Sequence, residues 1–573
     1  MSKKIKNFKF GLILTFALGL VVPVLSGLKE KGGMMAELVF LNGKIKTMDE
    51  HRPLAEALAI TQNRILRVGA TEEIKTLIGP ETKVIDLKGK LVLPGFIDAH
   101  THFLNGGFAL QAVNLRDCRS REEFVERIRQ KVRELPPGTW ILNGDWDHEQ
   151  FRPVELPRKE WIDKVTPEHP VCVNRFDGHM VLLNSLALKI AGIDKNTVSP
   201  PGGEIVRDPV SGEPTGILKD AACDLVYARL PEPSSEEKMR AVRLALQEAA
   251  RHGVTSIHDM SDPSSFEVYE ELLKRGELTA RLYVYFQITD IDHVVKLKLR
   301  SGFGHPFLRW AGLKGFVDGS LGSSTAYFFE PYADNPQTCG LLASHMFPEG
   351  IMEKRLRLAY ENGIQVAIHA IGDRANALIL DIMEKIIKGR SGGHPRWRIE
   401  HAQHLRAEDI RRLAELGLVA SVQPYHLIDD GCWAEKKIGK KRARTTYAFR
   451  SLLEAGAVLA FGSDWTVAPL NPLAGIYAAV TRRTLDGLHP DGWIPEEKIT
   501  AEQAVKAYTV NAAWAEFSEK EKGSLAPGKL ADLVVIDRDI FSLNPAEIIN
   551  CRVLLTMVDG RIVFVDETSG LVK

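Results

Sequence analysis

The stretch Phe96-Ile97-Asp98-Ala99-His100-Thr101-His102 decides the fold of this chain. It is apolar up to the histidines and follows Leu93-Pro94-Gly95, so the pattern predicts a buried strand that begins after a turn. Residues i and i+2 of a strand point to the same side, so His100 and His102 direct their imidazoles at one point. Two neutral imidazoles there suit a divalent metal such as zinc. Two strand-end histidines with ordinary hydrogen-bond partners are the alternative, and the rest of the chain decides between the two.

The middle of the chain alternates short apolar strand candidates with helical patterns, which is typical of a parallel α/β sheet. The candidates are residues 96–102, 254–260, 281–288, 313–320, 365–372, 398–403, 419–424 and 458–465. Eight strand–helix units predict a closed (β/α)8 TIM barrel over residues 95–514. About 150 residues separate the first two strands, where a few are usual, so residues 115–245 are predicted to form an insertion domain.

Both ends of the chain contain short strands and turns instead. Strand pairs are expected around Asn42-Gly43, Gln62-Asn63, Lys88-Gly89 and Asp559-Gly560, which are hairpin signals. Neither end is long enough to bury a sheet by itself. Residues 36–94 and 515–573 are therefore predicted to form one composite β-sandwich.

Residues 1–33 have the pattern of a secretory signal peptide. Four lysines precede an apolar run over residues 10–25, and small residues follow. An uncleaved membrane anchor formed by residues 10–25 is a second interpretation. A mis-annotated start is a third, because Met34 and Met35 come just before the first strand. The protein is cytoplasmic if the chain starts near Met34 or Met35, and otherwise secreted or membrane-anchored.

The composition argues against a nucleic-acid partner and against a fold held by cysteines. Lys and Arg together number 74, as do Asp and Glu, so the formal net charge is zero and no electrostatic footprint for nucleic acid is present. The six cysteines are scattered without a C-x-x-C pair, which indicates neither a zinc finger nor a disulfide framework. A small-molecule substrate is expected, and the sequence leaves a homo-oligomer open.

Five of the eight strand candidates supply the ionisable side chains of a candidate site, most of them near the C-terminal end. In a (β/α)8 barrel, chemistry takes place at the C-terminal ends of the strands, and a charge inside the wall needs a partner or a metal. Each of these residues has a structural explanation when it is taken alone: a helix cap, a satisfied core histidine or a surface lysine. Together they predict a site at one end of the barrel. Its members are His100, His102, Lys314, His369, His401 and Asp464.

These segments resemble the amidohydrolase superfamily, in particular amidohydrolase family 3, the YtcJ-like branch that includes N-substituted formamide deformylases. The resemblance covers essentially everything after residue 36. It rests on residues 94–102, 317–322, 368–375, 399–401, 462–465 and 523–533.

The resemblance implies a metal-dependent hydrolase with two zinc ions, although another divalent metal would suit the same ligands. It gives His100, His102 and Asp464 to one metal, and His369 and His401 to the other. Lys314, carboxylated by carbon dioxide, would bridge the two, because a carbamate offers two anionic oxygens. Asp464 would also take the proton of the attacking water. A one-metal site with an unmodified Lys314 stays open.

The function expected from this site is hydrolysis of non-peptide C–N bonds, as in linear amides, through a metal-activated water. Two alternatives stay open: a deaminase on the same scaffold, and a non-catalytic binding or regulatory protein. Four further residues are candidates for contact with the substrate. They are His179, Asp318, Trp146 and Arg374.

Overall fold

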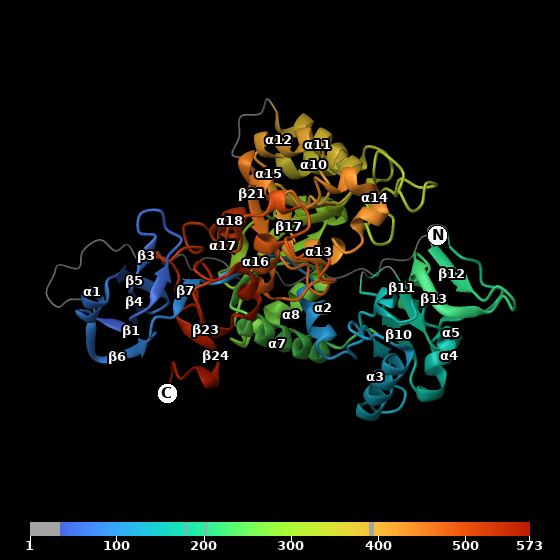
Figure 1. Cartoon of the computed structure of the whole chain (residues 1–573), viewed down its shortest axis with the longest axis horizontal. Helices are drawn as coiled ribbons and strands as arrows, with labels where there is room; N and C mark the ends of the chain where they lie inside the picture. Colours follow the sequence, from blue (N-terminus) through green and yellow to red (C-terminus); the bar gives the residue numbers. More distant parts are fainter. Residues whose placement is uncertain (1–34, 177, 179, 201–202, 389–394, 573) are drawn as a thin grey trace.

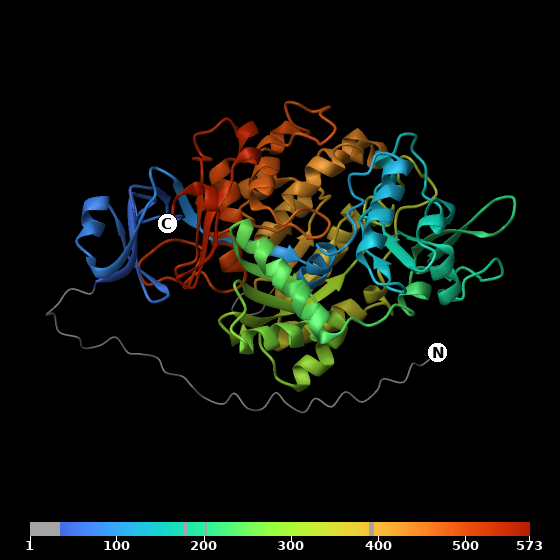
Figure 2. The same ribbon diagram turned by 90° about the horizontal axis from the view of Figure 1, so that it is seen from below.

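The computed structural model describes residues 35–176, 178, 180–200, 203–388 and 395–572. Figure 1 shows three parts side by side: the sheets built from both ends of the chain, a central barrel, and the inserted residues on the opposite side of the barrel. The same order is visible after a turn of 90° (Figure 2).

The central part is a parallel barrel, as predicted. Its strands follow the order β8-β14-β15-β17-β18-β19-β20-β21. They are β8 (Phe96–Thr101), β14 (Val254–Met260), β15 (Arg281–Gln287), β17 (Leu308–Phe316), β18 (Gln365–Ala370), β19 (Arg398–His401), β20 (Val419–Val422) and β21 (Val458–Phe461). All eight strand candidates are therefore present. Short apolar runs that alternate with helical patterns are typical of the buried strands of a parallel sheet.

The fourth strand differs from its prediction. It begins at Leu308, where β16 (Phe303–His305) pairs with it, and it ends at Phe316. Beyond it, the Asp318 carboxylate accepts backbone N–H bonds from Ile371 and Gly372, which lie past the end of β18. Here a side chain, and not a neighbouring strand, accepts the backbone N–H bonds. Residues 317–320 therefore form a loop outside the sheet.

The barrel closes between its last and first strands. The backbone N–H of Asp464 donates to the carbonyl of His100 at 2.7 Å, and that of His102 donates to Trp465 at 2.8 Å. The Asp98 carboxylate accepts the backbone N–H of Ser463 at 2.9 Å. A Cβ at Gly462 would lie 2.5 Å from the backbone nitrogen of His100, so a glycine is needed for this close approach.

Helices cover the outside of the barrel and connect its strands. Two short ones, α2 (Phe103–Ala109) and α9 (Ile291–Lys296), follow β8 and β15. The others are α7 (Ser235–Arg251), α8 (Pro263–Lys274), α10 (Ile351–Glu361), α11 (Asp373–Ile387), α12 (Ala407–Glu415), α13 (Pro424–Asp430), α14 (Ala434–Ala443), α15 (Phe449–Glu454), α16 (Pro472–Thr481), α17 (Ala501–Ala507) and α18 (Val510–Ala515). Their apolar faces and the outward side chains of the strands form the main core.

Both ends of the chain contribute to two further sheets. One has the order β5-β4-β1-β6 and the other β24-β23-β22-β7-β2-β3, and a shared apolar core lies between them. The first contains β1 (Ala36–Leu41), β4 (Ala57–Thr61), β5 (Arg64–Gly69) and β6 (Ile78–Asp86), with α1 (Thr71–Lys75) beside it. The second contains β2 (Lys44–Lys46), β3 (Leu54–Ala55), β7 (Leu91–Pro94), β22 (Leu533–Ile536), β23 (Val553–Val558) and β24 (Arg561–Val565).

Two of the expected hairpins are wrong. The chain does turn at Asn42 and Lys88, both with positive φ, but each turn carries it from one sheet into the other. β1 and β6 pair in parallel in the first sheet, and the strands that follow them, β2 and β7, pair in parallel in the second. Bonds such as Gly89 N–H to the Asn42 carbonyl at 2.7 Å keep the two crossings together. Pairing between neighbouring segments therefore outweighs the local turn signal. The hairpins β4–β5 and β23–β24 form as expected.

The residues inserted after α2 form a sheet of their own, with the order β12-β13-β11-β10-β9. It consists of β9 (Ile141–Leu142), β10 (Val171–Asn174), β11 (Met180–Leu183), β12 (Gly203–Arg207) and β13 (Pro214–Asp220). Around it lie α3 (Arg121–Glu134), α4 (Lys159–Ile162), α5 (Ser185–Ala191) and α6 (Asp224–Tyr227). The predicted end at residue 245 falls inside α7, which packs against α2 and α8 and so belongs to the barrel.

Within the part of the chain that the structure describes, none of the helices combines the length and the apolar character needed to cross a bilayer. The segment 1–33, with its predicted signal or anchor, lies outside the described residues.

Candidate metal centre

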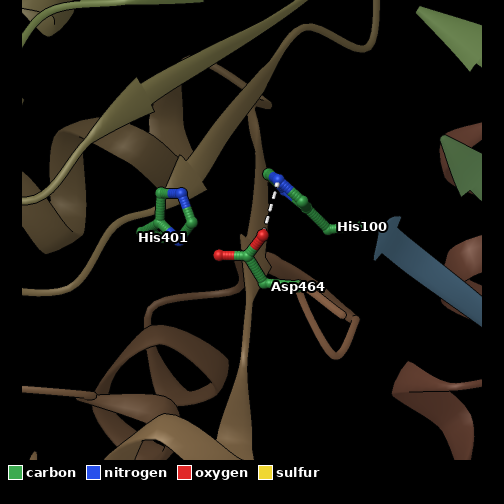
Figure 3. A group of neighbouring side chains, drawn as sticks. All are labelled: His100, His401 and Asp464. Atoms are coloured by element: carbon green, nitrogen blue, oxygen red, sulfur yellow. Dashed lines mark ion pairs between the residues drawn. The ribbon is translucent and has the colours of Figure 1, made fainter. Parts of the chain in front are cut away.

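Three of the predicted ligands come together at the C-terminal end of the barrel. His100 is the next-to-last residue of β8, His401 ends β19 and Asp464 follows β21. One potential ligand atom from each lies within 4.8 Å of the others. Figure 3 shows their side chains pointing toward one another. His401 and Asp464 have positive φ values of 72° and 56°, so the backbone turns out of the strand at both positions.

The other predicted ligands surround this group. The Nε2 of His102 lies 3.3 Å from Asp464 Oδ1, and the Nε2 of His100 lies 3.6 Å from the same oxygen. The Lys314 amine is buried and lies 3.4 Å from His100 Nε2. The ring of His369 has its centre 4.5 Å from that of His401. The structure therefore brings all six residues to one place.

Each of the four histidines has one ring nitrogen directed at an acceptor in the protein. His100 Nδ1 contacts the Glu400 carboxylate, and His102 Nδ1 lies 3.1 Å from the Met260 carbonyl. His401 Nδ1 lies 2.7 Å from Gln423 Oε1, and His369 Nε2 lies 3.0 Å from the Gly319 carbonyl. An acceptor at one nitrogen holds the proton there. The other nitrogen is thus left with a lone pair for a metal.

These residues fit a metal ion in spacing and in charge. Two nitrogen or oxygen ligands of one tetrahedral zinc, each about 2.1 Å from it, lie about 3.4 Å apart, which matches the contacts of Asp464 Oδ1 with His100 and His102. Burial lowers the pKa of His100 to about 4 and that of His369 to about 3, so both are neutral at pH 7, as ligands must be. Burial opposes protonation of His102 as well, but its hydrogen bond to Asp464 raises its pKa.

Lys314 has an environment that favours its neutral amine. Burial lowers its pKa to about 8, against the opposing influence of Glu400 and Asp464. The neutral amine is the form that adds carbon dioxide. Its position beside His100 is therefore compatible with the carbamate that the family resemblance implies.

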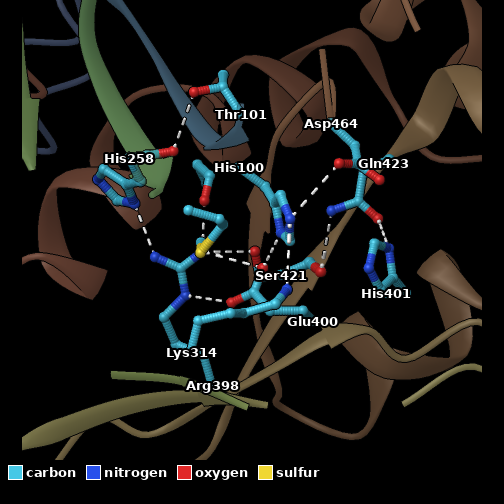
Figure 4. A network of polar contacts seen from close by, with 12 residues as sticks. His100, Thr101, His258, Lys314, Arg398, Glu400, His401, Ser421, Gln423 and Asp464 are labelled. Carbon is cyan, nitrogen blue, oxygen red and sulfur yellow. Dashed lines mark hydrogen bonds and ion pairs between the residues drawn. The ribbon is translucent and has the colours of Figure 1, made fainter. Parts of the chain in front are cut away.

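Sequence reasoning missed the residues that hold the ligands in place. Glu400 and Arg398 lie two residues apart on β19, so both point into the barrel, where both are completely buried. Arg398 donates to Glu400 Oε1 at 2.8 Å and to Ser421 at 2.7 Å (Figure 4). Two opposite charges two residues apart in a short strand predicted to be buried were the available signal.

His426 is a second residue that the sequence reasoning missed. It lies in α13 after the seventh strand, and its ring is stacked on that of His401, 6.4 Å from centre to centre. Its buried Nε2 has no hydrogen-bond partner among the described residues.

The four predicted substrate contacts lie in different surroundings. The Asp318 side chain is fully buried and accepts backbone N–H bonds from Tyr327, Ile371 and Gly372, which is the role of a loop anchor. Trp146 has no exposed surface and donates to the Val173 carbonyl inside the inserted core, so it is placed for packing and not for substrate contact.

Arg374 is exposed at the start of α11, with its guanidinium 4.6 Å from the centre of the Tyr327 ring. Among the residues described, it makes no contact with the six candidate ligands. His179 lies outside the described residues.

Comparison with known proteins identifies the family of this chain. A family model described as "Amidohydrolase family" matches residues 83–564. Protein LONG AFTER FAR-RED 3 of Arabidopsis thaliana is 41% identical over 553 residues, covering 94% of this chain and 93% of that protein. YtcJ of Bacillus subtilis strain 168 is 32% identical, with coverages of 92% and 99%. The N-substituted formamide deformylase of Arthrobacter pascens is 29% identical, with coverages of 92% and 98%.

Among solved structures, an uncharacterized metal-dependent hydrolase from Pyrococcus horikoshii OT3 superposes with a TM-score of 0.74 at 26% identity. The match covers 89% of this chain and 99% of that one. The family match spans most of the chain and includes all six candidate ligands. The chain therefore belongs to the amidohydrolase family.

Proposed function

We propose that this protein is a metal-dependent hydrolase that cleaves non-peptide C–N bonds, with linear amides as the first substrate class to test. The observation that carries the proposal is the arrangement of four buried or half-buried histidines, each with one nitrogen directed at a protein acceptor and the other left for a metal beside Asp464. Burying so many polar groups in a barrel interior costs free energy unless they bind an ion.

The donor set divides into two groups. His100, His102 and Asp464 would hold one metal, and His369 and His401 would hold a second. Lys314, as a carbamate, would bridge them. Bound divalent metals would supply a Lewis acid that polarises a carbonyl and lowers the pKa of water towards ~7.

Asp464 is the residue placed to move a proton. Burial alone would raise its pKa, but the neighbouring His100, His102 and His401 hold it well below the ordinary value. Its side chain is therefore a carboxylate at neutral pH. Oδ1 lies 3.6 Å from His100 Nε2 (Figure 3) and 3.3 Å from His102 Nε2, which leaves Oδ2 to accept the proton of the attacking water.

The reaction balances without another reactant. Water adds its oxygen to the carbonyl carbon, and its proton goes to Asp464. The C–N bond then breaks, and Asp464 returns the proton to the leaving nitrogen, which gives a carboxylic acid and an amine. His102 is the exposed member of the ligand set, with 36% of its side chain accessible, so the substrate approaches from its side.

The choice of amides is supported by the relative from Arthrobacter pascens, whose name states an N-substituted formamide as substrate. The decisive experiment is a screen of purified, zinc-loaded protein against N-substituted formamides, N-acyl amino acids and cyclic amides, with amine release as the readout and Asp464→Asn as the control. Ammonia release from amidine-like compounds without amide turnover would identify a deaminase. Zinc binding without turnover of any of these compounds would favour a binding protein.

A further inference from the structure

The interior of the barrel contains a continuous column of ionisable side chains. Barrel interiors are normally filled by branched apolar residues, so a column of this kind needs an explanation. Its side chains are between 0% and 6% exposed. In order from the metal centre, its members are His100, Glu400, Arg398, His258, Glu516 and Lys522.

The half of the column nearest the candidate metal centre, Glu400 and Arg398, determines the tautomer of His100. One oxygen of Glu400 contacts His100 Nδ1, and the other accepts from Arg398 Nε at 2.8 Å (Figure 4). Arg398 Nη2 also donates at 3.3 Å to the oxygen that contacts His100, so the guanidinium pairs with both carboxylate oxygens of Glu400. A carboxylate on Nδ1 fixes the tautomer of His100 and makes its Nε2 a stronger ligand.

The lower half of the column holds Arg398 from the other side. Arg398 Nη1 donates to His258 Nδ1 at 2.7 Å, so the proton of that imidazole is on Nε2. This nitrogen lies 3.2 Å from Glu516, and the other oxygen of Glu516 lies 2.5 Å from Lys522. Glu516 directly follows α18, and Lys522 lies between α18 and β22, so the column reaches the segment that leads to the C-terminal strands.

Of the four histidines in the candidate site, His100 is the one whose protein-directed ring nitrogen has a carboxylate as its hydrogen-bond partner; the nearest carboxylate oxygen to His369 Nε2, that of Asp318, lies 3.6 Å away. The partners of His102, His401 and His369 are a carbonyl, an amide oxygen and a carbonyl. The column therefore acts on one of the two proposed metal positions and not on both.

We infer that Glu400 and Arg398, together with His258 and Glu516, are positioning residues that set the affinity of the metal position at His100. This rests on the proposed metal-dependent function. Removing a link leaves the next charge buried without its partner, so the remaining side chains must shift, and the shift reaches His100. A change at Glu516, at the far end of the barrel interior, is thus felt at the metal.

The test measures zinc affinity and not turnover. Wild type, Glu400→Gln and Glu516→Gln are stripped of metal as full chains and titrated with zinc against a chromogenic chelator. Glu400→Gln is expected to weaken zinc binding at the His100 site about 10- to 100-fold. Glu516→Gln is expected to weaken the same site about 2- to 30-fold and to leave the second equivalent unchanged.

Asp409→Asn is the matched control. Asp409 is equally buried and accepts from Arg406 and Arg412, but it lies on α12 outside the barrel. It should lower the melting temperature without changing zinc affinity by more than about 2-fold. If Glu516→Gln does not fold, the double variant Glu516→Gln/Lys522→Met is tested in its place. This variant removes both charges of the Glu516–Lys522 pair, so neither is left buried without a partner.

A double-mutant cycle completes the test. Once Glu400 is neutral, Glu516→Gln should have almost no further effect on zinc affinity, because the path to His100 is already broken. Wild-type affinity in Glu516→Gln, or full additivity in the cycle, would overturn the inference even if the protein hydrolyses amides. Zinc affinities that follow the column in a protein with no amide turnover would instead overturn the proposed function alone.

Discussion

Asp464 contacts His100 twice: its backbone N–H donates to the His100 carbonyl at 2.7 Å, and its carboxylate lies 3.6 Å from the Nε2 of the same residue. The first contact joins the last strand of the barrel to the first, and the second brings two candidate ligands together. The contacts that close the barrel therefore also position two of the candidate ligands. A change that loosens this seam should affect both stability and metal binding.

Gly462→Ala tests this seam. The added Cβ would lie 2.5 Å from the His100 backbone nitrogen, so β21 must move away from β8. Unfolding by denaturant should show a loss of about 1–3 kcal/mol, typical of overpacking. Zinc affinity should fall as well. A variant as stable as wild type would show that the two strands separate at no cost.

Metal content should reach two equivalents per chain in zinc-loaded wild type, measured by elemental analysis after dialysis. The variant His100→Ala/His102→Ala should keep at most one equivalent and lose activity, because His369 and His401 are left as the remaining pair. One equivalent or less in the wild type would contradict the two-metal arrangement. Persistent turnover in the double variant would place the active site elsewhere.

Asp464→Asn separates proton transfer from metal binding. The amide keeps one ligand oxygen but cannot accept a proton, so kcat should fall about 10²–10⁴-fold while at least one metal is retained. In the wild type, Asp464 has a pKa well below its usual value, so the rate should hold at neutral pH and fall only in acid, as the carboxylate is protonated. Near-normal kcat in the Asn variant would exclude Asp464 as the base.

Lys314 should be carboxylated. Addition of carbon dioxide forms an N–C bond at the neutral amine and releases one proton, so the carbamate should increase as pH rises through the amine pKa of about 8. Carbon-13 NMR of protein equilibrated with labelled bicarbonate should show a signal that Lys314→Met lacks. Lys314→Ala should be inactive and partly rescued by short carboxylic acids. A spectrum identical to that of Lys314→Met would refute the modification.

Asp318 should prove structural. Asp318→Ala leaves buried N–H groups of Ile371 and Gly372 without an acceptor, at about 1–3 kcal/mol each. Asp318→Asn keeps one acceptor oxygen and should lose less stability, with KM close to wild type. An Asn variant of normal stability but greatly raised KM would instead make Asp318 a substrate contact.

The sequence alone was sufficient to predict the barrel and to propose the candidate ligands. Eight apolar runs predicted all eight barrel strands, because strands buried on both faces are nearly continuous in apolar residues and here alternate with helical patterns. His100, His401 and Asp464 could be proposed as one site from their positions at strand ends, since those ends of a closed barrel meet on one face.

Only the tertiary structure decided which side chains meet. The turn signals at Asn42 and Lys88 are real, but the partner strands are chosen by the packing of two sheets and not by the turn. Trp146 belongs to a core that a local pattern does not reveal. The contact of Glu400 with His100 joins residues 300 positions apart. Local patterns report the conformation of a segment, whereas such partners are set by burial around a closed barrel, which depends on the whole chain.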